Sequence, residues 1–323
     1  GFSNNFASRI FAEYGNEAID IIEDNPYVLI EDIRGFGFQK ADQLAMKIGF
    51  QYDSSVRIQG ALTYAIHEIC FSAGNTYVLK DELVKAAGNI LALGQQQQVA
   101  PDVIETILQE MSELGLLISG DDLKVAIPSL YYAEAGIAAR MKHMQFERYQ
   151  PNYPDVDLDK EISALEKKLN ITYGAAQKMA IKEALTSKVY ILTGGPGTGK
   201  TTVLNGIVHI YAKLNNLSLD IDDYHDRTFP ISLAAPTGRA AKRMGETTGL
   251  PASTIHRLLG LTGEDFDDDA DSASFTLETD LLIIDEMSMV DTFLAFRLLE
   301  SIPAYMQVIF VGDRDQLPSV GPG

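Results

Sequence analysis

The strongest chemical pattern in the sequence is the glycine-rich run GGPGTGKT, from Gly194 to Thr201, which matches G-x-x-x-x-G-K-[ST] without a gap. Its glycines let successive backbone N–H groups wrap around phosphate oxygens, and a helix that starts here adds its positive end. Lys200 would reach the β- and γ-phosphates of a nucleotide, and the Thr201 hydroxyl would ligate Mg²⁺. We therefore expect ATP and Mg²⁺ as cofactors, with a nucleotide site made of Gly195, Pro196, Gly197, Thr198, Gly199, Lys200, Thr201 and Thr202.

Two adjacent carboxylates have the types and spacing that phosphoryl transfer from ATP requires. The apolar run 281–284 predicts a buried strand, and Asp285 and Glu286 follow at its carboxyl end, where open α/β sheets bind their ligands. Asp285 would hold Mg²⁺, directly or through a water molecule, and Glu286 would polarise the attacking water. Lys200 and Glu286 are thus two expected catalytic residues.

A further polar cluster follows another strand-like run. Residues 308–311 are apolar and lead into Gly312, Asp313 and, shortly afterwards, Gln316. Gln316 is placed to sense the γ-phosphate and to couple it to movement, which makes it the third expected catalytic residue. The alternative is a loop glutamine whose amide is satisfied by the backbone.

The elements that must position these residues alternate between strands and helices. Strand-like runs cover 189–192, 229–235, 281–284 and 307–311, and helical patterns separate them. This order predicts an α/β fold class over residues 158–323, with a parallel sheet covered by helices on both faces.

The N-terminal half has a different pattern, mainly α-helical. Residues 1–52 predict short helices, with Gly35 and Gly37 between two helical patterns. Glycine backbone can approach a phosphate closely, and the helix that follows offers its N-terminal N–H groups. This segment resembles the helix-hairpin-helix module of DNA-binding proteins, so Gly35 and Gly37 are candidate DNA contacts. The alternative is an ordinary connection in a helical bundle.

Residues 53–150 predict a second helical domain. Helical spacing continues to about residue 114, and the run 115–127 predicts a hairpin with a Gly-Asp turn. Helices followed by a hairpin suggest winged-helix character. The segment 150–157, with two prolines and several acids, is the expected boundary before the α/β domain, and Gln95 to Gln98 is expected to be a solvated loop.

Several of these motifs together resemble one family. The segments 285–291 and 312–323 resemble motifs II and III of superfamily 1 helicases of the RecD-like branch, and 235–244 resembles motif Ia of that branch. The segment 253–260 resembles its next DNA-contacting motif, and Gln177 resembles the glutamine that reads adenine. The resemblance is specific over 172–323 and looser over 1–150. It implies a RecA-like first motor domain of a P-loop NTPase, preceded by DNA-binding modules.

The resemblance also implies DNA contacts, which are Pro236, Thr237, Arg239, Thr254 and His256. Independently of the resemblance, the segment 237–239 follows a strand and offers a hydroxyl, an exposed N–H and a guanidinium, which are groups that bind phosphate. The alternatives are a turn at a helix start for the first three residues and a packed core histidine for His256. The insertion 261–279 occupies the place of the family's strand-separating pin, but its acidic residues depart from what a wedge near DNA needs and favour a solvated, mobile loop.

Bulk properties limit the function classes. A net charge of −19 argues against broad, non-specific adhesion to DNA. The single cysteine, Cys70, excludes an intramolecular disulfide framework and a multi-cysteine zinc site, and a buried small apolar residue is expected there. No apolar run is long enough for a membrane helix and no secretory signal begins the chain, so a cytoplasmic protein without membrane association is expected.

The motifs and the resemblance combine into one hypothesis. It is an ATP-dependent DNA helicase of DNA repair or recombination that moves 5′→3′ on single-stranded DNA and acts at single-strand/double-strand junctions. The polarity comes from the resemblance alone. Because a second motor domain and its arginine are absent, we expect these residues to bind nucleotide but to lack full activity. An RNA helicase of the same superfamily and a nucleotide-gated DNA-binding module in a larger complex are the alternatives.

Overall fold

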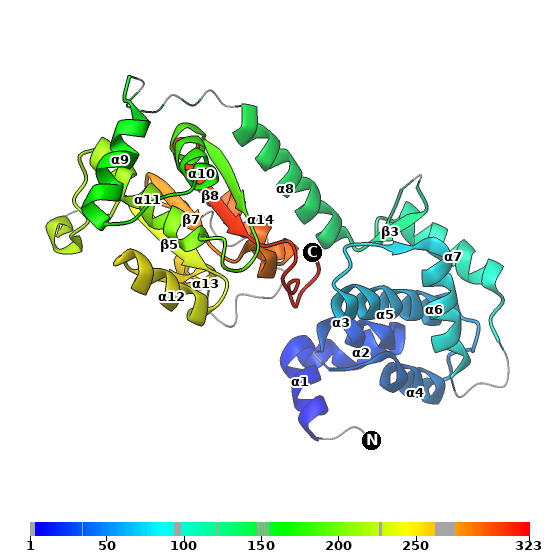
Figure 1. The fold of residues 1–323 in the computed structure, drawn as a ribbon. Helices are drawn as coiled ribbons and strands as arrows, with labels where there is room; N and C mark the ends of the chain where they lie inside the picture. Colours follow the sequence, from blue (N-terminus) through cyan, green and yellow to red (C-terminus); the bar gives the residue numbers. More distant parts are fainter. Residues whose placement is uncertain are drawn as a thin grey trace. The chain divides into compact units, whose positions relative to one another are not determined.

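In a computed structural model, the chain forms two compact units, residues 1–132 and residues 133–321 (Figure 1). The structure describes residues 4–323 apart from 34, 94–97, 121, 147–148, 150, 152, 154, 226–227 and 262–274. Most of the expected insertion 261–279 and of the glutamine tract 95–98 therefore lies outside the described residues. No helix in the described part of the chain is long and apolar enough to span a lipid bilayer.

The first unit begins with a series of short helices, as the sequence predicted. Pro26 starts a 3₁₀ turn, and the Asn25 side chain accepts a hydrogen bond from the Tyr27 N–H at 3.0 Å. Gly35 and Gly37 lie between two helices, and Gly37 is the N-cap of the second. The elements are α1 (Asn4–Tyr14), η1 (Gly15–Glu17), α2 (Ala18–Asp24), η2 (Pro26–Val28), α3 (Leu29–Asp32) and α4 (Phe38–Ile48).

The rest of this unit combines three helices with a small antiparallel sheet. Its elements are α5 (Ser55–Ala73), β1 (Val78–Leu79), α6 (Lys80–Ala92), α7 (Pro101–Glu113), β2 (Ile118–Ser119) and β3 (Lys124–Ala126). The sheet order is β1-β3-β2, and β2 and β3 form the predicted hairpin. The helix–strand–helix–helix–strand–strand order is that of a winged-helix domain. The sequence pattern missed β1, which is only two residues long.

A buried ion pair joins the helix-hairpin-helix region to the helices that follow it. The Arg57 side chain is fully buried on α5, and its Nε and Nη2 donate to the two carboxylate oxygens of Asp42 on α4, at 2.7 and 2.9 Å. Tyr27 donates to the same carboxylate at 2.7 Å. The expected domains 1–52 and 53–150 thus share one network, and their residues up to 132 form one compact unit.

The second unit is built on a parallel sheet of five described strands, in the order β4-β8-β7-β5-β6. The strands are β4 (Val189–Thr193), β5 (Ile231–Ala235), β6 (Ala252–Thr254), β7 (Leu281–Ile284) and β8 (Gln307–Gly312). The four strands predicted from the sequence are confirmed, and β6 is an addition. Helical elements of this unit are α8 (Pro128–Phe146), α9 (Leu158–Leu169), α10 (Ala175–Thr186), α11 (Lys200–Leu214), η3 (Ile221–Tyr224), α12 (Gly238–Thr248), α13 (Ile255–Leu258), η4 (Met287–Met289) and α14 (Thr292–Glu300).

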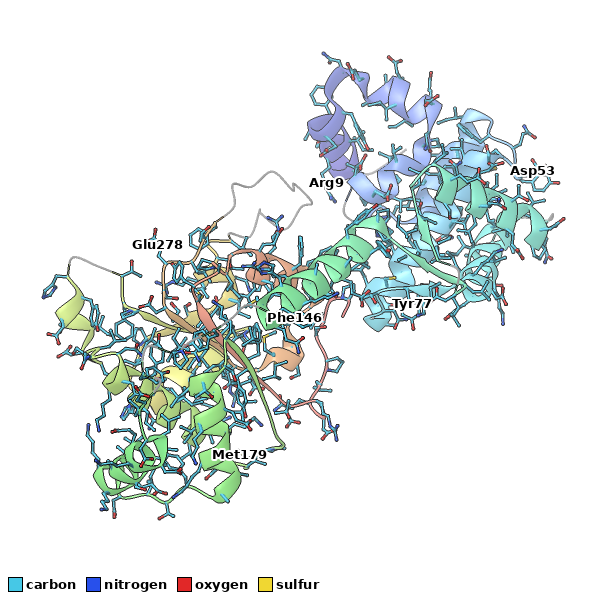
Figure 2. The ribbon with its side chains drawn as sticks, turned by 90° about the horizontal axis from the view of Figure 1, so that it is seen from above. Arg9, Asp53, Tyr77, Phe146, Met179 and Glu278 are labelled. Atoms are coloured by element: carbon cyan, nitrogen blue, oxygen red, sulfur yellow. The ribbon has the colours of Figure 1, made fainter. Side chains whose placement is uncertain are left out.

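Helices cover both faces of this sheet, as predicted. Alternate residues of β7 point to opposite faces, so Ile283 packs in one core with α9, α10 and α11, while Ile284 packs in another with α8, α13 and α14. All four residues of β7 are fully buried, which is typical of a central parallel strand. Side chains fill the space between the sheet and its helices (Figure 2).

The division between the two units falls within α8, earlier in the chain than the segment 150–157 expected from the sequence. The C-terminal half of α8 packs on the sheet through Ile137, Met141 and Met144. Arg140 adds hydrogen bonds to the carbonyl oxygens of Leu299 and Ile302. These contacts assign residues from 133 onward to the α/β unit, although prolines and acids are concentrated further on.

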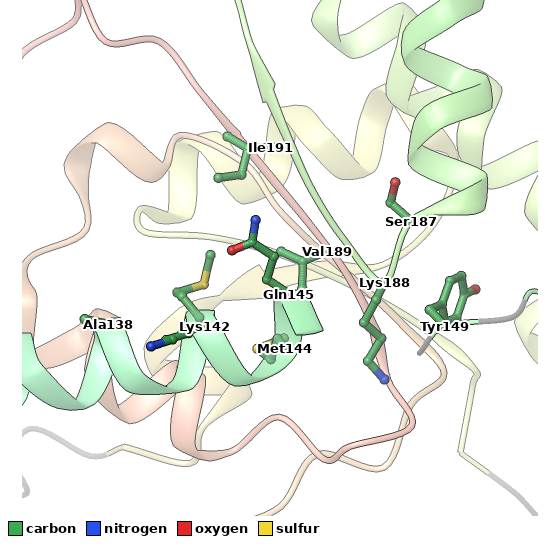
Figure 3. Close-up of a pocket in the computed structure, with 10 residues that line it drawn as sticks. Ala138, Lys142, Met144, Gln145, Tyr149, Ser187, Lys188, Val189 and Ile191 are labelled. Carbon is green, nitrogen blue, oxygen red and sulfur yellow. The ribbon is translucent and has the colours of Figure 1, made fainter. Parts of the chain in front are cut away.

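A cavity of about 660 Å³ lies between α8 and the outer edge of β4 (Figure 3). Met141, Lys142 and Met144 of α8 line it together with Val189 and Ile191 of β4. None of the expected nucleotide or DNA contacts lines this cavity. Elsewhere, Cys70 is fully buried, and burial raises the pKa of its thiol to about 11, which confirms its expected role as a small apolar core residue.

Candidate functional site

The residues singled out in the sequence gather along one edge of the parallel sheet. Because all five strands run in the same direction, their carboxyl ends share this edge. The glycine-rich loop follows β4, Asp313 follows β8, and Asp285 follows β7. Pro236 and Thr237 follow β5, and Thr254 ends β6. The strand order therefore places the ATP motifs at one end of this edge and the expected DNA motifs at the other.

The glycine-rich loop connects β4 to α11 in the conformation that a phosphate cradle requires. Gly197 and Gly199 have φ angles of +75° and +83°, in the left-handed region that glycine tolerates best. Thr198 donates from Oγ1 to the Gly195 carbonyl at 2.9 Å and closes the loop. Gly199 is the N-cap of α11, so the first N–H groups of a fifteen-residue helix lie at the end of the loop.

Lys200 folds back over this loop. Its Nζ donates to the carbonyl oxygens of Gly194 and Gly195, the latter at 3.1 Å. It also lies 4.0 Å from the Oδ2 atom of Asp313, with its side chain only 17% exposed. The ammonium group is thus held by loop carbonyls and one carboxylate, in the space that the loop encloses.

Gln177 fastens the loop to the start of α10. Its Oε1 accepts a hydrogen bond from the Gly174 N–H at 2.9 Å, and its Nε2 donates to the Thr198 carbonyl at 3.2 Å. A Cβ atom at Gly199 would lie 2.4 Å from this Nε2 atom. Here the Gln177 amide bonds to backbone at both ends, and we call this contact the Gln177 clip.

The paired carboxylates lie in different environments. Asp285 is partly buried, and its Oδ1 accepts a hydrogen bond from the Glu286 N–H at 2.8 Å. Burial raises the pKa of Asp285, while the Glu286 N–H and the charges of Lys200 and Arg243 lower it. Glu286 has a φ of +56°, a strained conformation for a residue with a side chain. Such strain is often found where a side chain must be aimed at a reaction centre.

Asp313 directly follows β8, and the sequence alone indicated no role for it. It is 2% exposed, its Oδ1 accepts from the Asp315 N–H at 3.1 Å, and its Oδ2 has no hydrogen-bond partner among the described residues. The signal that marks it is an acid directly after a buried strand, the same signal that identified Asp285. Gln316 is partly buried, and its N–H donates to the Asp313 carbonyl at 3.2 Å.

Two of the expected DNA contacts cap helices. The Thr237 hydroxyl accepts from the Ala240 N–H at 3.3 Å and caps α12, and the Thr254 hydroxyl accepts from the Arg257 N–H at 3.2 Å and caps α13. Capping uses an acceptor lone pair, so each hydroxyl keeps its hydrogen for another oxygen. β5 and β6 pair in register through Ala235 and Thr254, which brings the two segments side by side.

The other expected DNA contacts on this edge differ in exposure. Pro236 is partly buried, Arg239 is exposed on the first turn of α12, and His256 is partly buried on α13. Arg243, one helical turn beyond Arg239, was not singled out in the sequence. Its charge nevertheless lowers the pKa of Asp285, so α12 contributes positive charge near the ATP end of the sheet edge.

The hairpin Gly35–Gly37 belongs to the first unit, whereas the sheet edge belongs to the second. Gly35 has a φ of +80°, which explains a glycine there, and its carbonyl accepts from Lys40 Nζ at 3.2 Å. Gly37 is extended, with φ −78° and ψ 166°, and a Cβ atom there would meet the Tyr64 ring at an ordinary 3.6 Å. No contact with the described residues requires a glycine at position 37.

The sheet edge fits a nucleotide with a divalent cation. Asp285 and Asp313 end neighbouring strands, and the buried Asp313 Oδ2 accepts no hydrogen bond from the described residues. Lys200 lies 4.0 Å from this oxygen, and its charge also lowers the pKa of Asp285. This donor set calls for an additional cation once phosphates draw Lys200 away. The fold and the site together define a P-loop nucleoside triphosphatase of the RecA-like class.

Comparisons with known proteins refine this class. The family model for the helix-hairpin-helix domain of ATP-dependent RecD2 DNA helicases matches residues 1–77, and an AAA-domain model matches residues 177–322. The chain is 29% identical to the ATP-dependent RecD2 DNA helicase of Deinococcus radiodurans, over the whole chain and 43% of that protein. It is 37% identical to the RecBCD enzyme subunit RecD of Mycolicibacterium smegmatis, over 46% of the chain and 28% of that subunit.

A solved structure of the Pif1 helicase from Candida albicans is also similar, with 26% identity, a TM-score of 0.30 and coverage of 46% of this chain and 34% of that one. The chain thus spans less than half the length of each of these proteins. Both family models match in the expected order along the sequence, and the chain is similar to RecD-like helicases of superfamily 1.

Proposed function

We propose that this chain supplies the first motor domain and a DNA-binding region of an ATP-driven DNA helicase that moves 5′→3′ on single-stranded DNA in repair or recombination. The observation that carries the proposal is the single sheet edge shared by the phosphate-binding loop, the Asp285–Glu286 pair and the two capping threonines. A motor needs its nucleotide site and its strand contacts on one rigid element, so that a change in one alters the other. The similarity to ATP-dependent RecD2 and RecD helicases supports the same activity, and the polarity rests on the resemblance of the motifs alone.

In this proposal the chain's own residues divide the work on ATP. The loop N–H groups and the α11 N-terminus bind the phosphates, and Lys200 leaves the loop carbonyls for the β- and γ-phosphates. Thr201 and Asp285 would hold Mg²⁺, which would supply positive charge against the phosphates. Glu286 orients and polarises the attacking water, and Gln316 contacts the γ-phosphate. Gln177 reads adenine only after the Gln177 clip has opened or shifted.

Asp313 joins this set as a positioning residue for Lys200. Its buried oxygen provides a counter-charge at 4.0 Å while the phosphates are absent. An unpaired ammonium in this poorly exposed space would be unfavourable, so Asp313 stabilises the lysine until the nucleotide replaces it.

The strand contacts proposed on the motor are Pro236, Thr237, Arg239, Thr254 and His256. The two threonine hydroxyls each have a hydrogen to donate to a phosphate oxygen, and Arg239 is exposed beside them. This set reads the backbone rather than the bases, which suits a translocating enzyme. An RNA helicase would use the same groups, and the helix-hairpin-helix region favours DNA.

Gly37 supports the DNA contact of the first unit. The backbone angles of Gly37 suit any residue, and a Cβ atom there would meet Tyr64 at an ordinary distance. The missing side chain therefore leaves room for the DNA backbone to come close to Gly37. We expect Gly37→Ala to leave thermal stability unchanged and to weaken binding of a blunt DNA duplex several-fold. Equal binding by the variant would remove this support and leave an ordinary helix connection.

We further propose that these 323 residues bind ATP but hydrolyse it slowly, because the arginine that reaches the γ-phosphate in such motors comes from a second motor domain. Such an arginine is worth about 10³- to 10⁵-fold in rate. Isolated 323-residue protein that hydrolyses ATP as fast as the full-length protein would contradict this.

The decisive experiment measures ATP hydrolysis by the full-length protein with and without single-stranded DNA. We expect strong stimulation by DNA, its loss in Lys200→Ala, and its retention in Lys213→Ala, a control lysine at the far end of the same helix, α11. Stimulation by RNA alone would favour the RNA helicase. Nucleotide binding without stimulation by either would favour the nucleotide-gated module.

A further inference from the structure

A second cavity, of about 540 Å³, opens beside the glycine hairpin of the first unit. Its volume lies within the range of roughly 300–1,000 Å³ that is usual for small-molecule sites. Its lining includes Gly35, Gly37, Tyr64, His67, Glu68 and Phe71. The backbone that is proposed to bind DNA phosphates is therefore also a wall of this cavity, which we call the hairpin pocket.

One wall of the hairpin pocket is aromatic. Tyr64, His67 and Phe71 follow one another at helical spacing on α5, so they share a face of that helix. The His67 and Phe71 rings stack, with centroids 5.7 Å apart and planes 13° from parallel. Phe71 is nevertheless 47% exposed, so much of its surface is available to a further flat group. The Tyr64 ring lies directly behind Gly37.

Two of the polar side chains that line the hairpin pocket are carboxylates, beside His67 and Ser72. Glu31 and Glu68 both line it, and Glu31 lies 3.6 Å from His67 Nε2. The pKa of Tyr64 is raised, first by burial and then by Glu68. Two carboxylates repel phosphate but accept hydrogen bonds well, so the interior suits a flat group that carries amino hydrogens.

We propose that the hairpin pocket holds one unpaired nucleobase of the strand whose backbone lies on the hairpin, an inference that rests on the proposed DNA contact of Gly35 and Gly37. Aromatic stacking on Phe71 would bind any base, as in single-strand-binding proteins. The glutamates add selectivity. Cytosine and adenine offer exocyclic amino donors, while thymine presents carbonyl oxygens at the corresponding edge. The chain thereby distinguishes unpaired from paired DNA, and cytosine or adenine from thymine.

The test measures binding of the 323-residue chain to labelled oligo(dC), oligo(dT) and a blunt duplex by fluorescence anisotropy. We expect Phe71→Leu, which keeps an apolar side chain without an aromatic face, to weaken oligo(dC) binding about 5- to 100-fold. Duplex binding should not change, because a paired base cannot enter the pocket. Phe11→Ala, which removes an exposed phenylalanine on α1, is the matched control and should bind every probe as the unsubstituted chain does.

Glu68→Gln tests the selectivity. It should reduce the preference for oligo(dC) over oligo(dT), without lowering affinity for oligo(dT), because a negative charge near DNA is removed. A Phe71→Leu protein that binds oligo(dC) as tightly as the unsubstituted chain would overturn the pocket proposal, even where Gly37→Ala binds DNA poorly. Failure of the unsubstituted chain to bind any of the three probes would instead overturn the proposed DNA contact, and the pocket proposal with it.

Discussion

Removing the carboxylate of Asp42 should destabilise the first unit strongly, although Asp42 lies far along the chain from any proposed ATP contact. The Asp42→Ala change leaves the Arg57 guanidinium fully buried with two carbonyl partners, Tyr52 at 2.7 Å and Leu91 at 3.0 Å. It also removes the acceptor of the Tyr27 hydroxyl. The buried charge of Arg57 then has no counter-ion among the described residues.

The expected loss is about 3–5 kcal/mol of unfolding free energy, the usual cost of breaking a buried pair by removing one partner. This is a large part of the roughly 5–15 kcal/mol that holds a typical domain together. An exposed pair in the same unit provides the comparison. Lys80 and Glu105 lie 2.8 Å apart with side chains 34% and 45% exposed, so Lys80→Ala should cost less than about 1 kcal/mol.

Native-state hydrogen exchange, read by mass spectrometry on peptides from α4 and α5, measures this directly. Asp42→Ala should lower protection there by about 10²- to 10⁴-fold, while peptides of the parallel sheet keep theirs. The double substitution Asp42→Ala with Arg57→Met should recover part of the loss, since no unpaired charge remains. The reasoning would be refuted if Asp42→Ala lowered the protection of these peptides less than tenfold. It would also be refuted if the double variant lost more protection than the sum of the losses in the two single variants.

Three further predictions concern the motor unit. His209 Nδ1 is buried without a hydrogen-bond partner among the described residues, and burial, followed by the charge of Lys168, lowers the pKa of His209, so protonation favours the unfolded state. The free energy of unfolding, measured in urea titrations, should therefore keep its full value above about pH 6.5 and fall by up to about 1.4 kcal/mol per pH unit below it. His209→Gln should remove this dependence on pH. Gly199→Ala would place a methyl group 2.4 Å from the Gln177 amide nitrogen, at a residue whose φ is +83°. The affinity of the protein for a fluorescent ATP analogue should therefore fall at least about tenfold. Unchanged affinity would exclude a tight Gln177 clip. Asp313→Asn removes the counter-charge of Lys200, so ADP binding without Mg²⁺ should tighten by roughly tenfold in a fluorescence titration, and weaker binding would contradict the proposed positioning role.

The fold of the motor unit could be predicted because its strands are short, apolar and regularly spaced between helices. The run 281–284 is buried on both faces and is followed by polar residues, as is usual for a central parallel strand. By contrast, β6 has three half-buried residues, Ala252 to Thr254, and β1 has two residues. These strands exist because a neighbouring strand offers hydrogen bonds, and a local pattern cannot show that.

The candidate site was predictable to the extent that its chemistry is local in sequence. The glycine-rich loop and the Asp285–Glu286 pair carry their own spacing, and the sheet brings them together as expected. The Gln177 clip, the Lys200–Asp313 contact and the charge of Arg243 near Asp285 join residues that are distant in sequence. The hairpin pocket was missed for the same reason, because it needs α5 to lie against a hairpin nearly thirty residues earlier.

One hydrogen bond on the sheet edge has a thermodynamic consequence. The Asp285 N–H donates to the Ala234 carbonyl at 2.9 Å, so the acid proposed to hold the nucleotide's cation is bonded to the strand that leads into Pro236 and Thr237. If nucleotide and DNA strand both shift residues joined by this hydrogen bond, their binding affinities are coupled, and such coupling is reciprocal. If bound nucleotide changes the affinity for single-stranded DNA by some factor, bound DNA must change the affinity for nucleotide by the same factor. A measured pair of unequal factors would mean that the two ligands do not share one equilibrium between two states of this edge.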